Sequence, residues 1–293
     1  MYESFFGLSA TPFSLLPDAN FLFFSKHHKR VANLLEYGTI MQSGFMVITG
    51  EVGAGKTTII SHFLKNIGPN VSVGVITNPS NSFGSLFGWI AAAFDIEAEK
   101  DEIKIYNAFI EYLLAQYAKG KRTVLIVDEA QNMTVQMLED LRMLSNVNSA
   151  RDLLLQIVLV GQPELLATLK RNDLRQFIQR ISVHCHLTAL TAEETALYIR
   201  HRLSVVGGKP ELFDDEACAA IHYFAYGVPR LINLLCDHTL MYAFAEDEKQ
   251  ITFDTVFEVV SDHNSSELSA FRHFPAGQTR EQLQLALRQR EEA

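Results

Sequence analysis

Eight residues near position 50 restrict the possible folds of this chain more than any other feature of its sequence. They read Gly50-Glu51-Val52-Gly53-Ala54-Gly55-Lys56-Thr57, which has the spacing of a phosphate-binding loop. The apolar run Phe45–Thr49 precedes the loop, and a helix-forming stretch follows from Thr58. A chance glycine turn would need neither flank, so the pattern predicts a buried strand, a phosphate-binding loop and a helix in that order.

The residue types of this loop indicate which ligand it binds. Glycines allow backbone N–H groups to turn toward phosphate oxygens, and the N-terminus of the following helix adds its positive dipole end. In this pattern Lys56 reaches the β- and γ-phosphates, and the Thr57 hydroxyl is a ligand of Mg²⁺. We therefore predict ATP and Mg²⁺ as cofactors, bound by residues 50–58.

A second motif supplies carboxylates. The apolar run Val124–Val127 ends in Asp128 and Glu129. We predict that Asp128 holds Mg²⁺ through its water shell, and that Glu129 orients and deprotonates the water that attacks the γ-phosphate. Such a pair could instead begin a helix, as an N-cap and a first-turn acid. Its combination with the phosphate-binding loop favours the catalytic interpretation.

The order of apolar segments predicts the architecture of the first two-thirds of the chain. Runs of strand length alternate with helix-length stretches, and the apolarity within the runs is continuous, which is typical of parallel strands covered on both faces. The strand-length runs are 45–49, 71–77, 123–127, 153–160 and 181–187. We expect an α/β nucleotide-binding core over residues 1–188, with a parallel five-stranded sheet flanked by helices.

Beyond residue 188 the strand-like runs stop and helical patterns replace them. Thr191 followed by Glu193 and Glu194 is typical of a helix N-cap and its acidic first turn. We predict a small all-helical lid over residues 189–263. Residues 264–293 are polar, and we expect a tail that is mobile or forms a short terminal helix.

Composition limits the class of protein and its location. Apolar residues make up 48% of the chain and the net charge is −9, which fits a folded domain and counts against a surface coated with cations for nucleic acid. The three cysteines Cys185, Cys218 and Cys236 are widely spaced, as expected of reduced core residues. No apolar stretch has the length of a membrane span, so we expect a cytoplasmic protein without a span.

The order of these parts resembles the AAA+ ATPases, in which an α/β core is followed by a helical lid. The resemblance implies that Gln162, after the run Leu155–Gly161, is the polar sensor 1 residue. It also implies an arginine that reaches the γ-phosphate of a neighbouring subunit. Arg180 fits the family's Arg-Phe or Arg-Ile ending better than Arg175, although either could form an ordinary surface ion pair.

The same resemblance assigns a sensor 2 motif to Gly227-Val228-Pro229-Arg230-Leu231-Ile232-Asn233. Proline at the start of a helix is typical of a first helical position. Arg230 would then face the nucleotide. AAA+ proteins act as rings or other homo-oligomers, so the resemblance implies a second copy of the chain as a partner.

Further motifs are similar to those of ExeA-like ATPases, the general secretion pathway A class. They include Met1–Leu8, Pro12-Phe13, Pro17-Asp18, Asp128–Asn132, Gly161–Leu165 and Arg230–Cys236. The resemblance covers residues 1–262 and is strongest to the ATPases of exosortase and exopolysaccharide loci. Secretion-pathway members continue into a membrane span and a peptidoglycan-binding domain, and this chain has a short polar tail, so we do not expect direct cell-wall binding.

Two segments have competing interpretations. Phe13, Phe21, Phe23 and Phe24 could line the adenine side of the nucleotide pocket, as in relatives, but a phenylalanine-rich stretch is more often core. The loop Asn78–Ser82 could face a central pore, and a helix cap and turn is the simpler interpretation.

These observations predict an oligomeric AAA+ ATPase that hydrolyses ATP with Mg²⁺. We expect it to power or regulate assembly of a bacterial envelope secretion, pilus or exopolysaccharide export system, with an envelope-machinery protein as partner and a peripheral position at the inner membrane through that partner. The alternative is a DNA-binding ATPase of the transposition-regulator type, and a third interpretation is a switch that binds ATP but hydrolyses it poorly. The intact Glu129 counts against the switch.

Overall fold

The chain divides into two compact units. The computed structural model describes residues 1–16, 18–80, 84–97, 101–148, 152–265, 269–273 and 279–291. Residues 26–52 and 56–187 form an α/β unit. Residues 1–25, 53–55 and 188–293 group as a second unit, which is helical.

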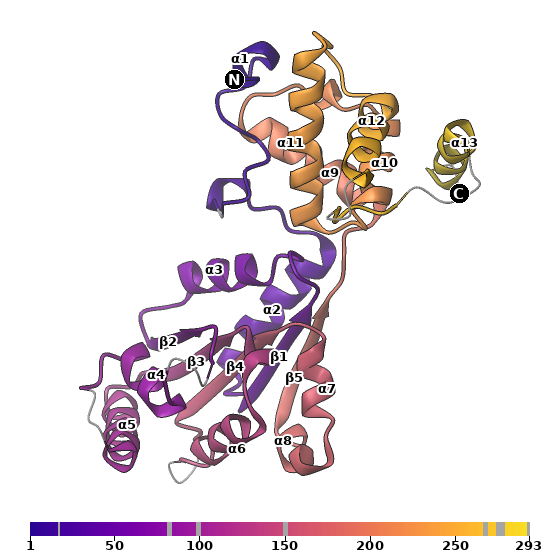
Figure 1. Cartoon of the computed structure of the whole chain (residues 1–293). Helices are drawn as coiled ribbons and strands as arrows, with labels where there is room; N and C mark the ends of the chain where they lie inside the picture. The colour runs from indigo at the N-terminus through magenta and orange to yellow at the C-terminus, as the bar shows by residue number, and fades with distance from the viewer. Residues whose placement is uncertain are drawn as a thin grey trace. The chain divides into compact units, whose positions relative to one another are not determined.

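Five parallel strands form one sheet in the α/β unit, in the spatial order β2-β3-β4-β1-β5. They are β1 (Phe45–Gly50), β2 (Val71–Thr77), β3 (Arg122–Asp128), β4 (Leu155–Gly161) and β5 (Ile181–Leu187). Every residue of β1 and β4 is buried, as expected where helices cover both faces of a parallel sheet (Figure 1). The prediction of a parallel five-stranded sheet flanked by helices is confirmed.

Helices connect these strands and cover the two faces of the sheet. They are α2 (Lys26–Ile40), α3 (Lys56–Asn66), α4 (Leu86–Ala93), α5 (Glu102–Ala118), α6 (Val135–Leu144), α7 (Glu164–Leu169) and α8 (Arg175–Ile178), with the 3₁₀ turns η2 (Ala130–Asn132) and η3 (Asn172–Leu174). Alternate β1 residues point to opposite faces: Phe45 lies 4.4 Å from Phe177 of α8, measured between ring centroids, whereas Met46 packs on α2. A Cβ atom on Gly38 would lie 2.3 Å from Sδ of Met46, so this glycine lets α2 approach the sheet closely.

The strand register brings together the ends at which the sequence motifs lie. Thr49 near the end of β1 pairs with Gly161 at the end of β4, and Val127 of β3 pairs with Leu159 of β4. All strands run the same way, so the residues that follow β1, β3 and β4 emerge at one edge of the sheet. This edge is where ligands bind in open parallel sheets.

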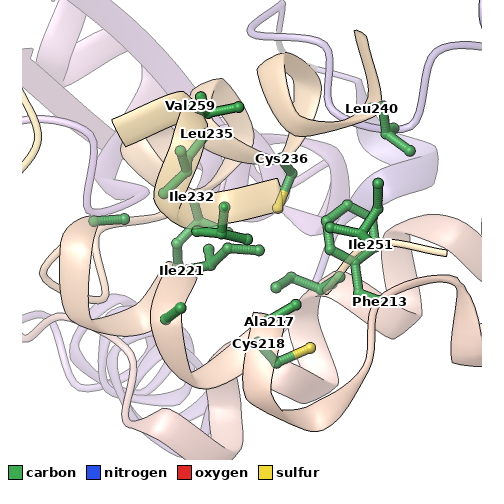
Figure 2. Close-up of a cluster of buried hydrophobic side chains, with 14 of the residues drawn as sticks. Phe213, Ala217, Cys218, Ile221, Ile232, Leu235, Cys236, Leu240, Ile251 and Val259 are labelled. Carbon is green, nitrogen blue, oxygen red and sulfur yellow. The ribbon is translucent and has the colours of Figure 1, made fainter. Parts of the chain in front are cut away.

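The second unit consists of helices around its own core. Its elements are α1 (Glu3–Phe6), η1 (Ala19–Phe21), α9 (Ala192–Val205), η4 (Pro210–Leu212), α10 (Asp215–Phe224), α11 (Pro229–Ala245), α12 (Phe253–Asn264) and α13 (Arg280–Glu291). Thr191 caps α9 in a capping box with Glu194, as the sequence predicts. In Figure 2, Cys218 of α10 and Cys236 of α11 lie among apolar side chains of the helices, and both are buried thiols, as predicted.

The N-terminal segment packs differently from our expectation. The predicted boundaries placed residues 1–25 with the α/β core on the adenine side, whereas their contacts group them with the helices that follow residue 188. Phe13 is 1% exposed and stacks edge-on against Phe213. The backbone N–H of Ser9 donates to the carbonyl of Val206 at 2.9 Å, and the Tyr2 hydroxyl donates to Asp237. Phe13 thus belongs to the core of the helical unit.

The C-terminal tail also contains packed structure. Leu283 is 3% exposed and Leu287 is buried, because residues four apart on α13 share one face and meet α10. The Gln284 amide donates to Glu216, and Arg280 forms an ion pair with Asp254. Of the two alternatives that we expected for the tail, residues 280–291 form the short terminal helix, and the side chains of Leu283 and Leu287 pack on the helical unit.

Some sequence features fall outside the described residues. These are Pro17 of the N-terminal motif and residues 81–82 of the loop considered as a pore element. Within the part of the chain that the structure describes, no helix combines the length and apolarity that a membrane span requires.

Candidate nucleotide-hydrolysis site

The loop Gly50–Thr57 joins β1 to α3, in the context that the sequence predicts. Gly53 has a φ of 79° and Gly55 a φ of 98°. These are left-handed backbone conformations that glycine adopts without steric cost. The two glycines therefore allow the tight path of the loop, and α3 begins at Lys56 immediately after them.

Lys56 is the most buried charged group of the loop, at 6% exposure. Its Nζ atom donates to the carbonyl of Gly50 at 2.7 Å and to the carbonyl of Glu51 at 2.9 Å. Burial lowers the pKa of Lys56, and the nearby carboxylates Glu129 and Asp128 partly offset that effect by favouring the charged form. The ammonium is thus held by the loop and faces the carboxylates at the end of β3.

Asp128 and Thr57 come together from two different elements. The Thr57 hydroxyl, in the first turn of α3, donates to Oδ2 of Asp128 at 3.2 Å. The other carboxylate oxygen, Oδ1, accepts from the backbone N–H of Glu129 at 2.9 Å. A hydroxyl and a carboxylate are hard oxygen ligands of the kind that Mg²⁺ prefers, so this pair fits the predicted metal.

Glu129 follows Asp128 in an unusual backbone conformation. Its φ of 54° and ψ of 38° lie in the left-handed region, which side-chain-bearing residues adopt rarely. Oε2 of Glu129 accepts a hydrogen bond from Nε2 of Gln162 at 3.3 Å. The structure therefore brings together Glu129 and Gln162, two residues that separate sequence motifs predicted.

Gln131 is a residue of this site to which sequence reasoning gave no role. Its Nε2 atom donates to Oε2 of Glu129, and its Oε1 atom accepts from the backbone N–H of Gln162 at 3.0 Å. Next to it, Nδ2 of Asn132 donates to Oδ1 of Asn78 at 2.8 Å. The available signal was the run Asp128–Asn132, which we used for the family resemblance without assigning its amide residues.

The two candidate arginines occupy different environments. Arg180 is half-buried, and its guanidinium donates to the Ser145 hydroxyl at 2.8 Å and to the carbonyl of Arg142 at 3.3 Å. It therefore binds the C-terminal end of α6. Arg175 is exposed at the start of α8, and its guanidinium donates to Oδ1 of Asn172 at 3.1 Å. The role of each arginine in trans remains a prediction.

The remaining predicted residues have the following positions. Glu51, Val52 and Thr58 are exposed, and Ala54 is buried within the loop. Arg230 lies in the first turn of α11, directly after Pro229 at the start of that helix. Its contact with nucleotide remains a prediction.

The class of this protein follows from the fold, the loop and a family comparison. Residues 40–169 match the model of the AAA domain family. This range includes the loop, Asp128, Glu129 and Gln162 at one edge of the parallel sheet. The α/β unit is that of an AAA+ P-loop ATPase.

Within this class the chain is related to general secretion pathway protein A. It is 40% identical to the protein of that name from Aeromonas hydrophila over a match of 253 residues, and this match covers 86% of the chain. The match spans 46% of the length of that relative. The predicted resemblance to ExeA-like ATPases is confirmed.

Solved structures share the fold at low identity. The ORC2 protein of Aeropyrum pernix, solved as ADPNP–ADP complexes, matches with a TM-score of 0.64 and 17% identity over 89% of this chain and 75% of that chain. Cdc6p from Pyrobaculum aerophilum matches with a TM-score of 0.65 and 14% identity, over 84% of this chain and 71% of that chain. These similarities support the AAA+ fold.

Proposed function

We propose that this chain hydrolyses ATP with Mg²⁺ at the edge of the sheet formed by β1, β3 and β4. The observation that carries the proposal is the pair of amides on Glu129: Gln131 and Gln162 both donate to its Oε2 atom, next to the Thr57–Asp128 pair. Nucleotide binding alone does not require a second carboxylate, such as Glu129, that hydrogen bonds fix in place. Hydrolysis needs one, because the attacking water must be oriented and must lose a proton.

Each residue then has one task. Backbone N–H groups of the loop and the Lys56 ammonium bind the phosphates, and Thr57 and Asp128 hold Mg²⁺. Bound Mg²⁺ neutralises charge on the phosphate oxygens. Glu129 accepts the proton of the attacking water, and Gln162 holds the carboxylate toward that position. Arg230 is the proposed sensor 2 contact of the helical unit.

Full activity in this proposal requires a second copy of the chain. An arginine delivered by a neighbouring subunit stabilises charge that develops on the transferring phosphoryl group, so hydrolysis depends on assembly. The environments favour Arg175 over Arg180 for this role. The Arg175 side chain is exposed, whereas Arg180 binds Ser145 and Arg142 within its own unit. We assign the trans contact to Arg175.

The biological setting that we propose is assembly or regulation of a bacterial envelope export system. The relationship to general secretion pathway protein A supports secretion as the setting. We place the protein in the cytoplasm, at the inner membrane through an envelope-machinery partner. Pilus and exopolysaccharide systems are specific forms of this proposal.

The test compares ATP hydrolysis by the wild type and by Glu129→Gln, each with and without duplex DNA. Glutamine keeps the shape of the side chain but cannot accept a proton, so we expect turnover to fall by about 100-fold or more while nucleotide affinity stays within about twofold. Steady-state phosphate release and binding of a fluorescent ATP analogue measure the two quantities. Unchanged turnover in Glu129→Gln would exclude the proposed base, and strong stimulation by DNA would favour a DNA-binding ATPase over the envelope role.

A further inference from the structure

The side chain of Gln131 links the proposed catalytic base to the end of the neighbouring strand. Its Nε2 atom donates to Oε2 of Glu129. Its Oε1 atom accepts from the backbone N–H of Gln162 at 3.0 Å. Gln131 lies in the turn η2 after β3, and Gln162 follows β4, so one side chain joins the ends of two adjacent strands.

An amide side chain suits both contacts because it carries a donor on one terminal atom and an acceptor on the other. A carboxylate oxygen needs a donor, and a backbone N–H needs an acceptor, so the two partners fix which end of the Gln131 amide points to which partner. Glutamate at this position would place two carboxylates together and would lose the donor. Leucine would fill similar space and make neither hydrogen bond.

Gly161 lies against the side chain of Gln131. A Cβ atom on Gly161 would lie 2.9 Å from Oε1 and 3.3 Å from the backbone nitrogen of Gln131. Gly161 is the last residue of β4, and its Cβ atom would also lie 3.0 Å from Cδ2 of Leu165. Because Gly161 has no side chain, the Gln131 amide can occupy this position.

Glu129 depends on such contacts for its orientation. Its backbone is left-handed, with φ of 54°, and its side chain does not cap the turn η2 that begins at the next residue. Gln131 and Gln162 donate to the same oxygen, Oε2. Among the residues that the structure describes, no hydrogen bond reaches Oε1, so that oxygen remains available to accept from water.

We propose that Gln131 is a positioning residue that holds the Glu129 carboxylate with Oε1 directed to the attacking water, and that Gly161 provides its seat. This inference rests on the proposed role of Glu129 as the base. Gln131 touches neither nucleotide nor water in this mechanism and acts through Glu129. Its effect should therefore appear in turnover and leave nucleotide binding unchanged.

The experiment uses the full chain with Gln131→Ala, Gln131→Glu and Gly161→Ala. Gln136→Ala is the matched control, since Gln136 is exposed on α6 and its amide donates to Asp140 of its own helix. We expect kcat to fall by about 10- to 100-fold in the three site variants, because a small displacement of a catalytic group costs this much, and the Kd for MgATP to stay within about twofold. Gln136→Ala should match the wild type in both.

The double variant Glu129→Gln, Gln131→Ala separates positioning from a structural role. If Gln131 acts through the Glu129 carboxylate, its removal has no further effect once that carboxylate is gone, so the double variant should turn over as slowly as Glu129→Gln. An additional loss of tenfold in the double variant would overturn the proposal. Wild-type or raised kcat in Gln131→Ala would overturn it too, even where Glu129→Gln is inactive.

The same data distinguish failure of the base from failure of the positioning residue. Full activity in Glu129→Gln contradicts the proposed function and the inference with it. An inactive Glu129→Gln beside a fully active Gln131→Ala contradicts the inference alone. Circular dichroism and MgATP affinity identify any variant that has not folded, and Gln131→Glu, which keeps the side-chain volume, then supplies the kcat comparison.

Discussion

Arg180 and Arg175 lie five positions apart and have opposite environments. Arg180 donates to Ser145 and to the carbonyl of Arg142, which are C-terminal groups of α6. Carbonyls at a helix end lack partners within the helix, and a cation there also meets the negative end of the helix dipole. The contacts therefore give Arg180 a stabilising role within its own unit.

We predict that Arg175→Ala loses hydrolysis and keeps stability, whereas Arg180→Ala loses stability. Removing an arginine that acts in trans should lower kcat by about 10³-fold. Removing the Arg180 hydrogen bonds should lower the free energy of unfolding by about 1–2 kcal/mol. Steady-state turnover and urea unfolding measure the two effects.

A mixing experiment supplies the control. Arg175→Ala retains its own site, and Lys56→Ala retains its own Arg175, so a mixture of the two variants should recover part of the activity that each lacks. A mixture as inactive as its components would contradict action in trans. Loss of turnover in Arg180→Ala without loss of stability would return the assignment to Arg180.

At the scale of elements, Arg202 of α9 joins the N-terminal segment to the helical unit. Arg202 is 6% exposed, and its guanidinium donates to the carbonyl of Pro12 at 2.6 Å and to that of Ser14 at 3.3 Å. It also donates to the Tyr198 hydroxyl at 3.0 Å and lies over the ring of Phe21, 4.6 Å from its centroid. A buried cation is tolerated here because several acceptors surround it.

We predict that Arg202→Met lowers the free energy of unfolding by about 2–3 kcal/mol, because two carbonyls and a hydroxyl lose their donor inside the unit. The segment 1–25 should then become sensitive to protease. The matched control is Arg200→Met on the same helix, since Arg200 forms a surface ion pair with Asp215 and its loss should cost about 0–1 kcal/mol. Equal effects of the two substitutions would contradict the role of Arg202.

The regular elements were largely predictable because their signals are local. Pro229 opens the first turn of α11, as the motif 227–233 predicts, and the run 45–49 predicts β1 to within a residue. Thr57, Asp128, Glu129 and Gln162 were predictable too, because fixed offsets from the ends of strands define them. Their assembly at one edge then follows from the parallel sheet.

Features that depend on contacts distant in the sequence were not predictable. Phe13 packs on Phe213, 200 positions away, and composition alone does not tell a core phenylalanine of the helical unit from one of the α/β unit. Leu283 and Leu287 form too short an apolar stripe to distinguish a docked helix from a frayed tail. The role of Gln131 depends on a hydrogen bond across two strands, which no single motif displays.

At the scale of the whole molecule, the chain contains two separate hydrophobic cores. One surrounds the sheet, with Phe45, Phe109 and Phe177 fully buried, and the other joins the helices, with Phe213 and Phe224 fully buried. Apolar burial of this kind is the main favourable contribution to folding. Each unit thus has its own source of stability.

We predict that assembly depends on bound MgATP. Glu129→Gln lacks the proposed catalytic base, so it should bind MgATP without hydrolysing it and should accumulate in the ATP-bound state. We expect subunits to meet through the trans arginine in that state. Light scattering coupled to size exclusion should then report a mass several times that of the 33.0 kDa chain for Glu129→Gln with MgATP. Without nucleotide the mass should be smaller. EDTA should return the smaller mass, because without Mg²⁺ the Asp128 carboxylate repels the phosphates. Lys56→Ala lacks the ammonium that we propose binds the phosphates, so it should keep one mass in all conditions. An equal mass for Glu129→Gln with and without MgATP would contradict nucleotide-driven assembly.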